Sequence, residues 1–303
     1  MANMKDKRIS VAMTTYNGAN YIEDQLKSIL GQTVPPEEII VCDDCSTDST
    51  VKILTGYHDK GLIKLFSNEV QLGVLDNFKK AVSLCKKDNY IALSDQDDFW
   101  LPNKIQLQYE AIQRIEDVET PCLVYSDLTL VDKELKVIDQ SFMHTLNINP
   151  SKESLKSLLF GNFITGCTIM LNGAMKKHFL QIPKEAYMHD AWLGLVAFTF
   201  GRNQYIKEQL IKYRQHGNNV TFETNKSVPF VVKFLNNFKS IFAENIFLKS
   251  NLQMAEYFLR SYGEEISDND YKTISHFLKL SNRTFVVKKI FSFLSRRYRY
   301  IGF

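Results

Sequence analysis

The amino-acid sequence predicts an α/β fold in which a mostly parallel central sheet is flanked by helices. Short apolar runs rich in β-branched residues alternate with stretches whose apolar residues recur every three or four positions. Several of the runs end directly in loops rich in acidic and hydroxyl side chains. Strands that alternate with helices at this spacing are typical of a parallel sheet covered on both faces.

The N-terminal part contains four such runs, and we expect strands at residues 9–13, 38–42, 63–66 and 90–93. A helix is expected to begin near Tyr21, because Ile22, Leu26, Ile29 and Leu30 follow at helical spacing. The segment 46–50 is rich in capping residues and predicts a second helix start, and residues 74–85 predict a third helix.

Beyond Pro121 the pattern is more mixed. Strands are expected at residues 122–125, 167–171 and 203–213, and helices at 155–159 and 191–200. From about Phe230 the chain is expected to be helical. These patterns place a boundary near Thr224, which separates residues 1–224 from a helical, basic region at 225–303.

Composition indicates an ordinary soluble protein with a net charge of +3. From Tyr271 to the last residue there is no Asp or Glu, and this basic stretch predicts contact with an anionic surface, either a membrane or a polyanion. The alternative is a solvated helical face. No nucleic-acid recognition motif accompanies the stretch, so no nucleic-acid partner is expected.

No signal peptide precedes Arg8, and the longest apolar stretch, 191–200, is shorter than the roughly 20 residues of a membrane-spanning helix. We therefore expect a cytoplasmic protein, peripheral on the inner face of the plasma membrane if its basic tail binds lipid. The number of cysteines, five, is odd and most are scattered, so a disulfide framework is not expected. Cys42 and Cys45 have the spacing of a redox or zinc half-site, but no helix start follows Cys42 and no second pair is present.

The most informative motif is the acidic run after the strand at 90–93, where Asp95, Asp97 and Asp98 lie within four positions. Clustered carboxylates with no nearby His or Cys pair suit Mg²⁺ or Mn²⁺, which usually act on phosphates. The alternative is a solvated turn or a cap of the helix that follows Pro102. Because parallel strands bring their C-terminal ends to one edge, Tyr16, Asp44 and Asp97 are expected to lie together.

Five motifs carry a family resemblance. They are residues 11–17, Val41-Cys42-Asp43-Asp44, residues 94–100, His189-Asp190-Ala191-Trp192 and residues 213–219. In order and spacing the chain resembles the inverting glycosyltransferases of family 2 with the GT-A fold, in particular the bacterial rhamnosyltransferase-like branch of cell-surface polysaccharide synthesis. The resemblance covers roughly the first two thirds of the chain. It implies a GT-A catalytic domain at 1–224, with a nucleotide-sugar half at about 1–120 and an acceptor half at about 121–224.

The resemblance implies a nucleotide diphosphate sugar as donor, with dTDP or UDP as its nucleotide. Its binding residues would be Thr14, Tyr16, Asn17, Asp43, Asp44, Asp95 and Gln96. The implied cofactor is Mn²⁺ or Mg²⁺, held by Asp97 with His216 nearby, and Arg214 is a weaker candidate for a phosphate contact. For Tyr16 the alternative is a packed aromatic, and for Asp44 a turn or cap residue.

Inversion requires a base that removes a proton from the acceptor hydroxyl, and the resemblance implies Asp190 in this role. Asp190 directly precedes the apolar helix, so it is also a candidate N-cap. The acceptor, a glycan or a lipid-linked glycan, would meet Trp100, Gly166, His189 and Trp192. For Trp100 the sequence leaves packing and acceptor contact open, and for His189 an exposed loop position is the alternative.

Three other functions compete with transfer of a sugar. A nucleotidyltransferase needs a Gly-rich, basic loop for a triphosphate, and residues 14–20 contain no Lys or Arg. A non-catalytic sugar- or nucleotide-binding partner subunit would lack the metal or base carboxylate, yet Asp97 and Asp190 are both present. A nucleic-acid binder has only the basic tail in its favour.

Overall fold

The structure is a computed structural model and describes residues 8–216 and 246–282. Its centre is a twisted sheet with the strand order β3-β2-β1-β4-β8-β6-β9-β5 in the described part of the chain. The first four strands in this order are β3 (Lys64–Ser67), β2 (Glu38–Asp43), β1 (Ile9–Thr15) and β4 (Tyr90–Ser94), and all pair in parallel. The expected α/β sheet is therefore confirmed.

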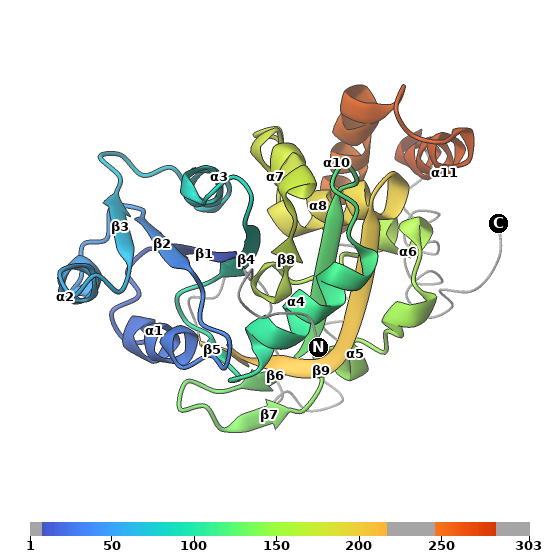
Figure 1. The fold of residues 1–303 in the computed structure, drawn as a ribbon. Helices are drawn as coiled ribbons and strands as arrows, with labels where there is room; N and C mark the ends of the chain where they lie inside the picture. The colour runs from blue at the N-terminus through green and yellow to red at the C-terminus, as the bar shows by residue number, and fades with distance from the viewer. Residues whose placement is uncertain (1–7, 217–245, 283–303) are drawn as a thin grey trace.

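The helices α1 (Ile22–Leu30), α2 (Thr50–His58) and α3 (Val74–Leu84) connect these strands and cover both faces of the sheet (Figure 1). Alternate strand residues belong to opposite apolar clusters, with Ala12 on the α3 side and Val11 and Met13 on the α1 side. Side chains on both faces of each strand must therefore be apolar, which explains the nearly continuous apolar runs.

The second half of the sheet is mixed. β8 (Met170–Leu171) pairs antiparallel with both β4 and β6 (Cys122–Val131), whereas β9 (Arg202–Arg214) pairs parallel with β6. β5 (Phe99–Trp100) pairs antiparallel with β9, and β7 (Val137–Asp139) with β6. The long strand β9 carries its C-terminal end to the loop between β4 and β5, which brings His216 to the acidic run (Figure 1).

One sequence-based expectation is wrong in detail, and one alternative interpretation is wrong altogether. The expected strand at 167–171 is strand only over β8, because residues Gly166–Thr168 form the turn η3, in which the Thr168 hydroxyl donates to the Thr165 carbonyl. The acidic run does not cap the next helix, α4 (Lys104–Ile115), whose N-cap is Asn103.

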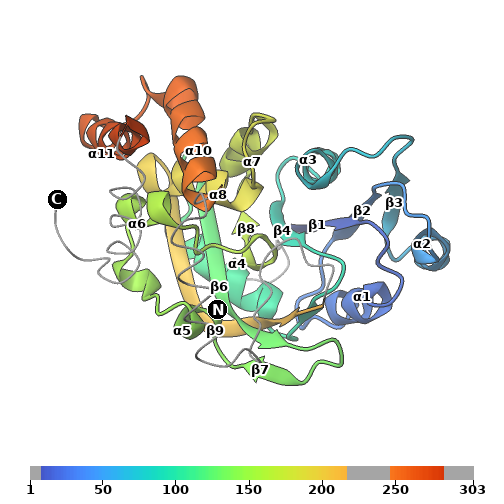
Figure 2. The ribbon, with the colours of Figure 1, turned by 180° about the vertical axis from the view of Figure 1, so that it is seen from behind.

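The other helices of the described residues lie beside the mixed half of the sheet (Figure 2). They are α5 (Phe142–Thr145), η2 (Pro150–Lys152), α6 (Leu155–Phe160), α7 (Gly173–Leu180), α8 (His189–Thr199), α10 (Ile246–Tyr262), α11 (Asp268–Leu278) and η4 (Lys279–Asn282). Of these, α7, α8, α10 and α11 gather at one end of this half of the sheet, while α5 lies at the other (Figure 2). Phe258 and Tyr262 of α10 pack on Trp192 of α8, so the last described helices share an apolar core with the sheet's helices.

The helix α8 begins two residues earlier than expected, with Met188 as its N-cap. Asp190 therefore lies inside the first turn and is not the N-cap. Among the described residues, no helix combines the length and apolarity needed to cross a bilayer. The expected boundary near Thr224 lies outside the described residues. Of the basic stretch that begins at Tyr271, residues 271–282 belong to α11 and η4, and residues 283–303 lie outside the described residues.

Candidate active site

An open cleft of about 240 Å³ lies at the C-terminal edge of the parallel strands. The end of β1 and the loops after β1, β2 and β4 form one part of it, and the segment before α3 with the first turn of α3 forms another. The end of β9 and the residue before α8 complete it. Its lining residues are Thr14, Thr15, Tyr16, Asp44, Gln71, Gly73, Val74, Asn77, Asp95, Gln96, Asp97, Met188 and Tyr213. The expected meeting of Tyr16, Asp44 and Asp97 at one edge is therefore found.

Tyr16 and Gln96 form one wall of the cleft. The Gln96 side chain accepts a hydrogen bond from the Tyr16 backbone N–H at 2.8 Å and donates to the Tyr16 carbonyl at 2.9 Å. Gly18 makes room for this pairing, because a Cβ atom there would lie 2.1 Å from Gln96 Oε1. The Tyr16 side chain is 45% exposed, so it is not a packed core aromatic.

Asp43 and Asn17 organise the loops and do not line the cleft. The buried Asp43 carboxylate accepts hydrogen bonds from the Thr15 hydroxyl and from the hydroxyl and backbone N–H of Ser46. Asn17 has a positive φ of 49° and joins its loop to Ser46 and Thr47 by backbone and side-chain hydrogen bonds. These contacts connect the ends of β1 and β2, which holds the cleft in shape.

Asp44 lines the cleft and also fixes its far wall. Its Oδ1 accepts from the Asn68 side chain and the Leu72 backbone N–H, both at 2.7 Å, and its Oδ2 accepts from the Gly73 N–H at 2.8 Å. A carboxylate offers about four acceptor positions, so one position on Oδ2 remains for a ligand. Asp44 thus holds the turn before α3 and, as a lining residue, retains one acceptor position on Oδ2.

The acidic run divides into three environments. Asp97 is half-buried, and its Oδ2 lies 2.8 Å from His216 Nε2. Asp95 is also half-buried, and burial together with the charges of Asp97 and Asp190 raises its pKa to about 7. Asp98 is fully buried, and burial together with Asp97 and Asp95 raises its pKa well above the usual range.

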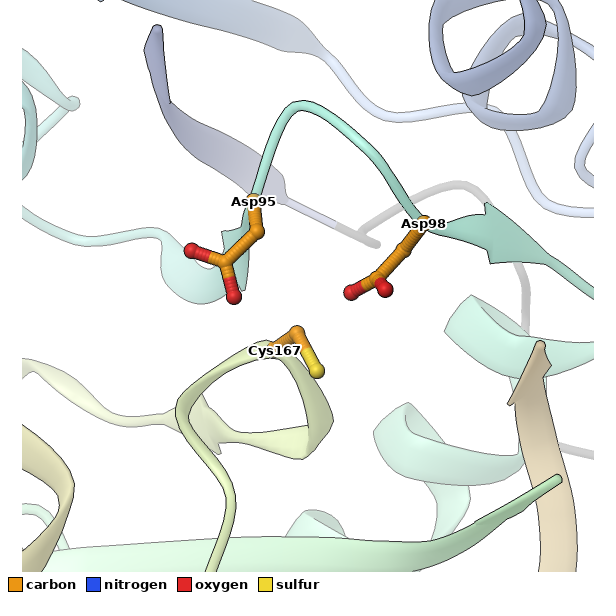
Figure 3. Close-up of side chains that lie close together, drawn as sticks. All are labelled: Asp95, Asp98 and Cys167. Atoms are coloured by element: carbon orange, nitrogen blue, oxygen red, sulfur yellow. The ribbon is translucent and has the colours of Figure 1, made fainter. Parts of the chain in front are cut away.

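Cys167 of η3 lies opposite Asp95 and Asp98, as Figure 3 shows. One atom from each of these three side chains lies within 4.8 Å of the others. Burial and the two carboxylates raise the pKa of the Cys167 thiol well above its usual range. The thiol therefore stays protonated at neutral pH and serves as a polar neighbour of Asp98.

Lys104 completes the buried layer under the acidic run. Burial lowers the pKa of its ammonium to about 7. Its Nζ donates to Gln108 Oε1 at 2.8 Å and lies 3.6 Å from the centre of the Trp100 ring. Sequence reasoning assigned no role to Lys104 or Cys167, because an isolated Lys or Cys on an element gives no signal before its buried neighbours are known.

Asp190 is 5% exposed and lies in the first turn of α8. Its Oδ2 accepts from the Gly166 backbone N–H at 3.2 Å, and its Oδ1 accepts from the Ala191 N–H. Burial raises its pKa to about 7, although these N–H donors act in the opposite direction. Its charge raises the pKa of Asp95, so the two carboxyl groups interact electrostatically.

The expected acceptor residues lie in the interior. His189 is 3% exposed, so the exposed-loop alternative is wrong. Its ring packs on Phe78 and Phe179, and burial lowers its pKa to about 4. A Cβ on Gly166 would lie 2.6 Å from His189 Nε2, so this position requires glycine or a shift of the imidazole.

The two tryptophans are core residues. Trp100 is 1% exposed and its backbone N–H donates to the Ser28 hydroxyl, which decides between packing and acceptor contact in favour of packing. Trp192 is fully buried against α10. Neither residue lines the cleft. Arg214 is also buried, and its guanidinium donates to the backbone carbonyl of Asp97.

The model of the family described as Glycosyl transferase family 2 matches residues 10–179, which is more than half of the chain. The chain belongs to glycosyltransferase family 2. The match spans the first four strands, the acidic run and β8, and it ends before α8. The family predicted from the five motifs is therefore confirmed, and the protein is a glycosyltransferase.

Named relatives agree with this membership. The dTDP-rhamnosyl transferase RfbG of Shigella flexneri is 28% identical over 235 residues, which are 73% of this chain and 76% of RfbG. The Bacillus subtilis protein TuaG, provisionally named a teichuronic acid biosynthesis glycosyltransferase, is 29% identical over 221 residues, or 70% of this chain and 81% of TuaG.

Solved structures show the same fold. S. aureus TarS 1-349 has a TM-score of 0.59 at 17% identity, with 97% of this chain and 72% of that chain covered. The mannosyltransferase PcManGT from Pyrobaculum calidifontis, in complex with GDP-Man and Mn²⁺, has a TM-score of 0.53 at 12% identity, with 99% and 90% covered. The chain therefore has the fold of these glycosyltransferases.

Proposed function

We propose that this glycosyltransferase is an inverting, metal-dependent enzyme that moves a sugar from a nucleotide diphosphate donor to a hydroxyl of a cell-surface polysaccharide or a lipid-linked oligosaccharide. The observation that carries the proposal is the arrangement of carboxylates around one cleft. Asp44, Asp95 and Asp97 line the cleft, and Asp97 pairs there with His216. Asp190 is not a lining residue, but it is buried two residues after the lining residue Met188, and its charge raises the pKa of Asp95.

The donor would occupy the cleft between Tyr16 and Asp44. The exposed ring of Tyr16 offers a face for a base, and Asp44 retains one acceptor position for a ring N–H. Thr14, Asp95 and Gln96 would line the ribose and diphosphate, whereas Asp43 and Asn17 would act by holding the loops. TarS has been solved with UDP and with UDP-GlcNAc, and RfbG is named for dTDP-rhamnose transfer. We favour dTDP-rhamnose or a UDP-sugar.

The side chains at the cleft fit a divalent cation. Asp97 and Asp95 offer carboxylate oxygens, which suit both Mn²⁺ and Mg²⁺. His216 beside Asp97 adds an imidazole nitrogen, a ligand that a transition-metal ion such as Mn²⁺ accepts more readily than Mg²⁺. When bound there, Mn²⁺ or Mg²⁺ would stabilise the negative charge that develops on the departing nucleotide diphosphate. Structural similarity to PcManGT, solved with Mn²⁺, supports this assignment.

Asp190 would act as the general base. Its carboxylate takes the proton of the acceptor hydroxyl while the acceptor oxygen forms a bond to the sugar C1 atom. The bond from C1 to the phosphate oxygen breaks, and its electron pair leaves with the nucleotide diphosphate. A base with a pKa near 7 is well matched to this transfer at neutral pH. Because the attack comes from the face opposite the leaving group, the configuration at C1 inverts.

The acceptor half would comprise residues 121–224, and the donor half residues 1–120. The names of TuaG and RfbG support a glycan or lipid-linked glycan acceptor. We further propose that the basic region within 225–303 contacts anionic lipid on the inner face of the plasma membrane. Liposome flotation of the full chain and of a chain that ends at Arg283 tests this proposal, and unchanged flotation after truncation would refute it.

A non-catalytic partner subunit is the second candidate, and one experiment separates the two. Nucleotide diphosphate release from a panel of nucleotide sugars is measured with Mn²⁺ and isolated cell-envelope glycan. We expect release by the native chain, loss of at least about 100-fold for Asp190→Asn, and no loss for Asp59→Asn, a control at the exposed end of α2. A native chain that binds a donor and releases no product would favour the partner subunit.

A further inference from the structure

Arg214 occupies an unusual position for a charged residue. It is the last residue of β9, and it is only 3% exposed. Burying a guanidinium is costly unless its donors find partners, so its contacts indicate what it holds. Its side chain is directed at groups from separate parts of the chain.

One contact reaches the proposed metal site. Arg214 Nε donates to the backbone carbonyl of Asp97 at 2.9 Å. Of its two terminal nitrogens, Nη1 donates to the backbone carbonyl of Lys133, in the turn between β6 and β7. Nη2 donates to the Asp24 carboxylate of α1 at 3.2 Å. A planar fork with fixed donor directions is suited to such a three-way connection, and a lysine has no equivalent geometry.

Tyr21 extends the connection to the second metal-site residue. Its ring centre lies 4.7 Å from Arg214 Cζ and also 4.7 Å from the His216 ring, to which it is inclined by 23°. The imidazole is therefore stacked on Tyr21 while its Nε2 lies 2.8 Å from Asp97 Oδ2. Tyr21 and Asp24 both belong to the start of α1, in the donor half, whereas Arg214 and His216 come from β9 and its end.

We propose that Arg214 and Tyr21 are positioning residues that hold Asp97 and His216 in the geometry required for the divalent cation. Arg214 fixes the backbone of Asp97, and Tyr21 fixes the plane of the His216 ring. The inference rests on the proposed metal role of Asp97 and His216. When a residue that holds a metal ligand in place is lost, the affinity for the metal typically falls by about 10- to 100-fold.

The test measures Mn²⁺ binding directly, from the electron paramagnetic resonance signal of free Mn²⁺, with UDP present. Arg214→Lys and Tyr21→Leu should each weaken Mn²⁺ binding by about 10-fold or more. Tyr21→Phe keeps the ring face and should bind within about two-fold of the native chain. Arg202→Lys is the matched control, because Arg202 lies at the other end of β9 and also contacts one carbonyl and one carboxylate.

A positioning role differs from a general structural role in two readouts. Binding of UDP without metal and the thermal unfolding temperature of the metal-free chain should change little in Tyr21→Leu, while Mn²⁺ affinity falls. Asp24→Asn alters a half-exposed partner of the guanidinium and gives a second measurement if Arg214→Lys does not fold. We expect a several-fold loss of Mn²⁺ affinity for it as well.

The outcomes separate this inference from the proposed function. A native chain that does not bind Mn²⁺ would refute the metal role of Asp97 and His216 itself. The positioning role alone would be overturned if the native chain binds Mn²⁺ and both Tyr21→Leu and Arg214→Lys bind it equally well. Asp24→Asn takes the place of Arg214→Lys if that variant does not fold. Equal losses in Tyr21→Phe and Tyr21→Leu would also contradict it, because the ring face would then be irrelevant.

Discussion

Replacing Asp190 by Asn should make the protein more stable at alkaline pH and less stable at acidic pH. In the native chain, burial raises the pKa of Asp190 from 3.8 to about 7, so the folded protein binds more protons than the unfolded chain between these values. The stability of the native chain therefore falls as pH rises through this interval. Asn at this position has no charge, and this dependence on pH disappears.

The difference between the pKa of Asp190 in the folded and in the unfolded chain determines how strongly stability depends on pH. Stability falls by about 1.4 kcal/mol for each pH unit between these two pKa values, so the native chain loses about 3 kcal/mol from pH 5 to pH 8 because of Asp190. Asn has one side-chain oxygen where Asp has two, so it loses the hydrogen bond from the backbone N–H of either Gly166 or Ala191. This loss lowers the free energy of unfolding by about 1–3 kcal/mol at every pH. The difference in unfolding free energy should therefore change sign between pH 5 and pH 8.

Urea-induced unfolding at pH 5, 6, 7 and 8 measures this difference. The buried Trp100 and Trp192 supply a fluorescence signal for loss of the core. Asp59→Asn on the exposed end of α2 is the control and should follow the native chain at every pH. Parallel curves for Asp190→Asn and the native chain would refute the reasoning, because the Asp190 carboxyl would then have an ordinary pKa in the folded protein.

Three further outcomes are expected. The value of kcat/KM should fall about tenfold per pH unit below pH 7, because Asp190 must be ionised to act as a base; a flat profile down to pH 5 would contradict this role. Gly18→Ala should weaken nucleotide binding by about tenfold, because its Cβ would displace Gln96 from Tyr16. Gly56→Ala is its control, since a Cβ there meets nothing within 4 Å, and it should stabilise α2 by about 1 kcal/mol. Gly166→Ala should lower donor turnover by displacing His189 and the N–H that holds Asp190; unchanged turnover would show that this contact is unimportant.

The fold was predictable because its signals are local. Apolar patterns identified the four parallel strands β1 to β4 and the three helices between them, and the parallel arrangement then placed Tyr16, Asp44 and Asp97 at one edge. The short strand β5 was not predicted. The motifs also indicated the family, which the match over residues 10–179 confirms. These inferences needed no knowledge of distant contacts.

Side-chain environments were not predictable in this way. His189 and Asp190 are adjacent in sequence, yet one packs between aromatic rings while the other accepts hydrogen bonds beside the cleft. The burial of Trp192 depends on α10, which lies more than 50 residues later in the chain. Arg214 resembled a phosphate ligand because nothing in its own motif shows that Asp24 and Lys133 occupy its donors.

The central claim is that Asp97 and its neighbours bind a nucleotide diphosphate together with a divalent cation. Thermal unfolding of the native chain and of Asp97→Asn, with UDP, dTDP or GDP and with or without Mn²⁺, tests it most directly. A ligand that binds the folded chain raises the unfolding temperature by mass action. We predict a rise with at least one nucleotide that is larger with Mn²⁺ in the native chain and is equal with and without Mn²⁺ in Asp97→Asn. The absence of any rise with these nucleotides, or a Mn²⁺ effect that persists in Asp97→Asn, would contradict the account.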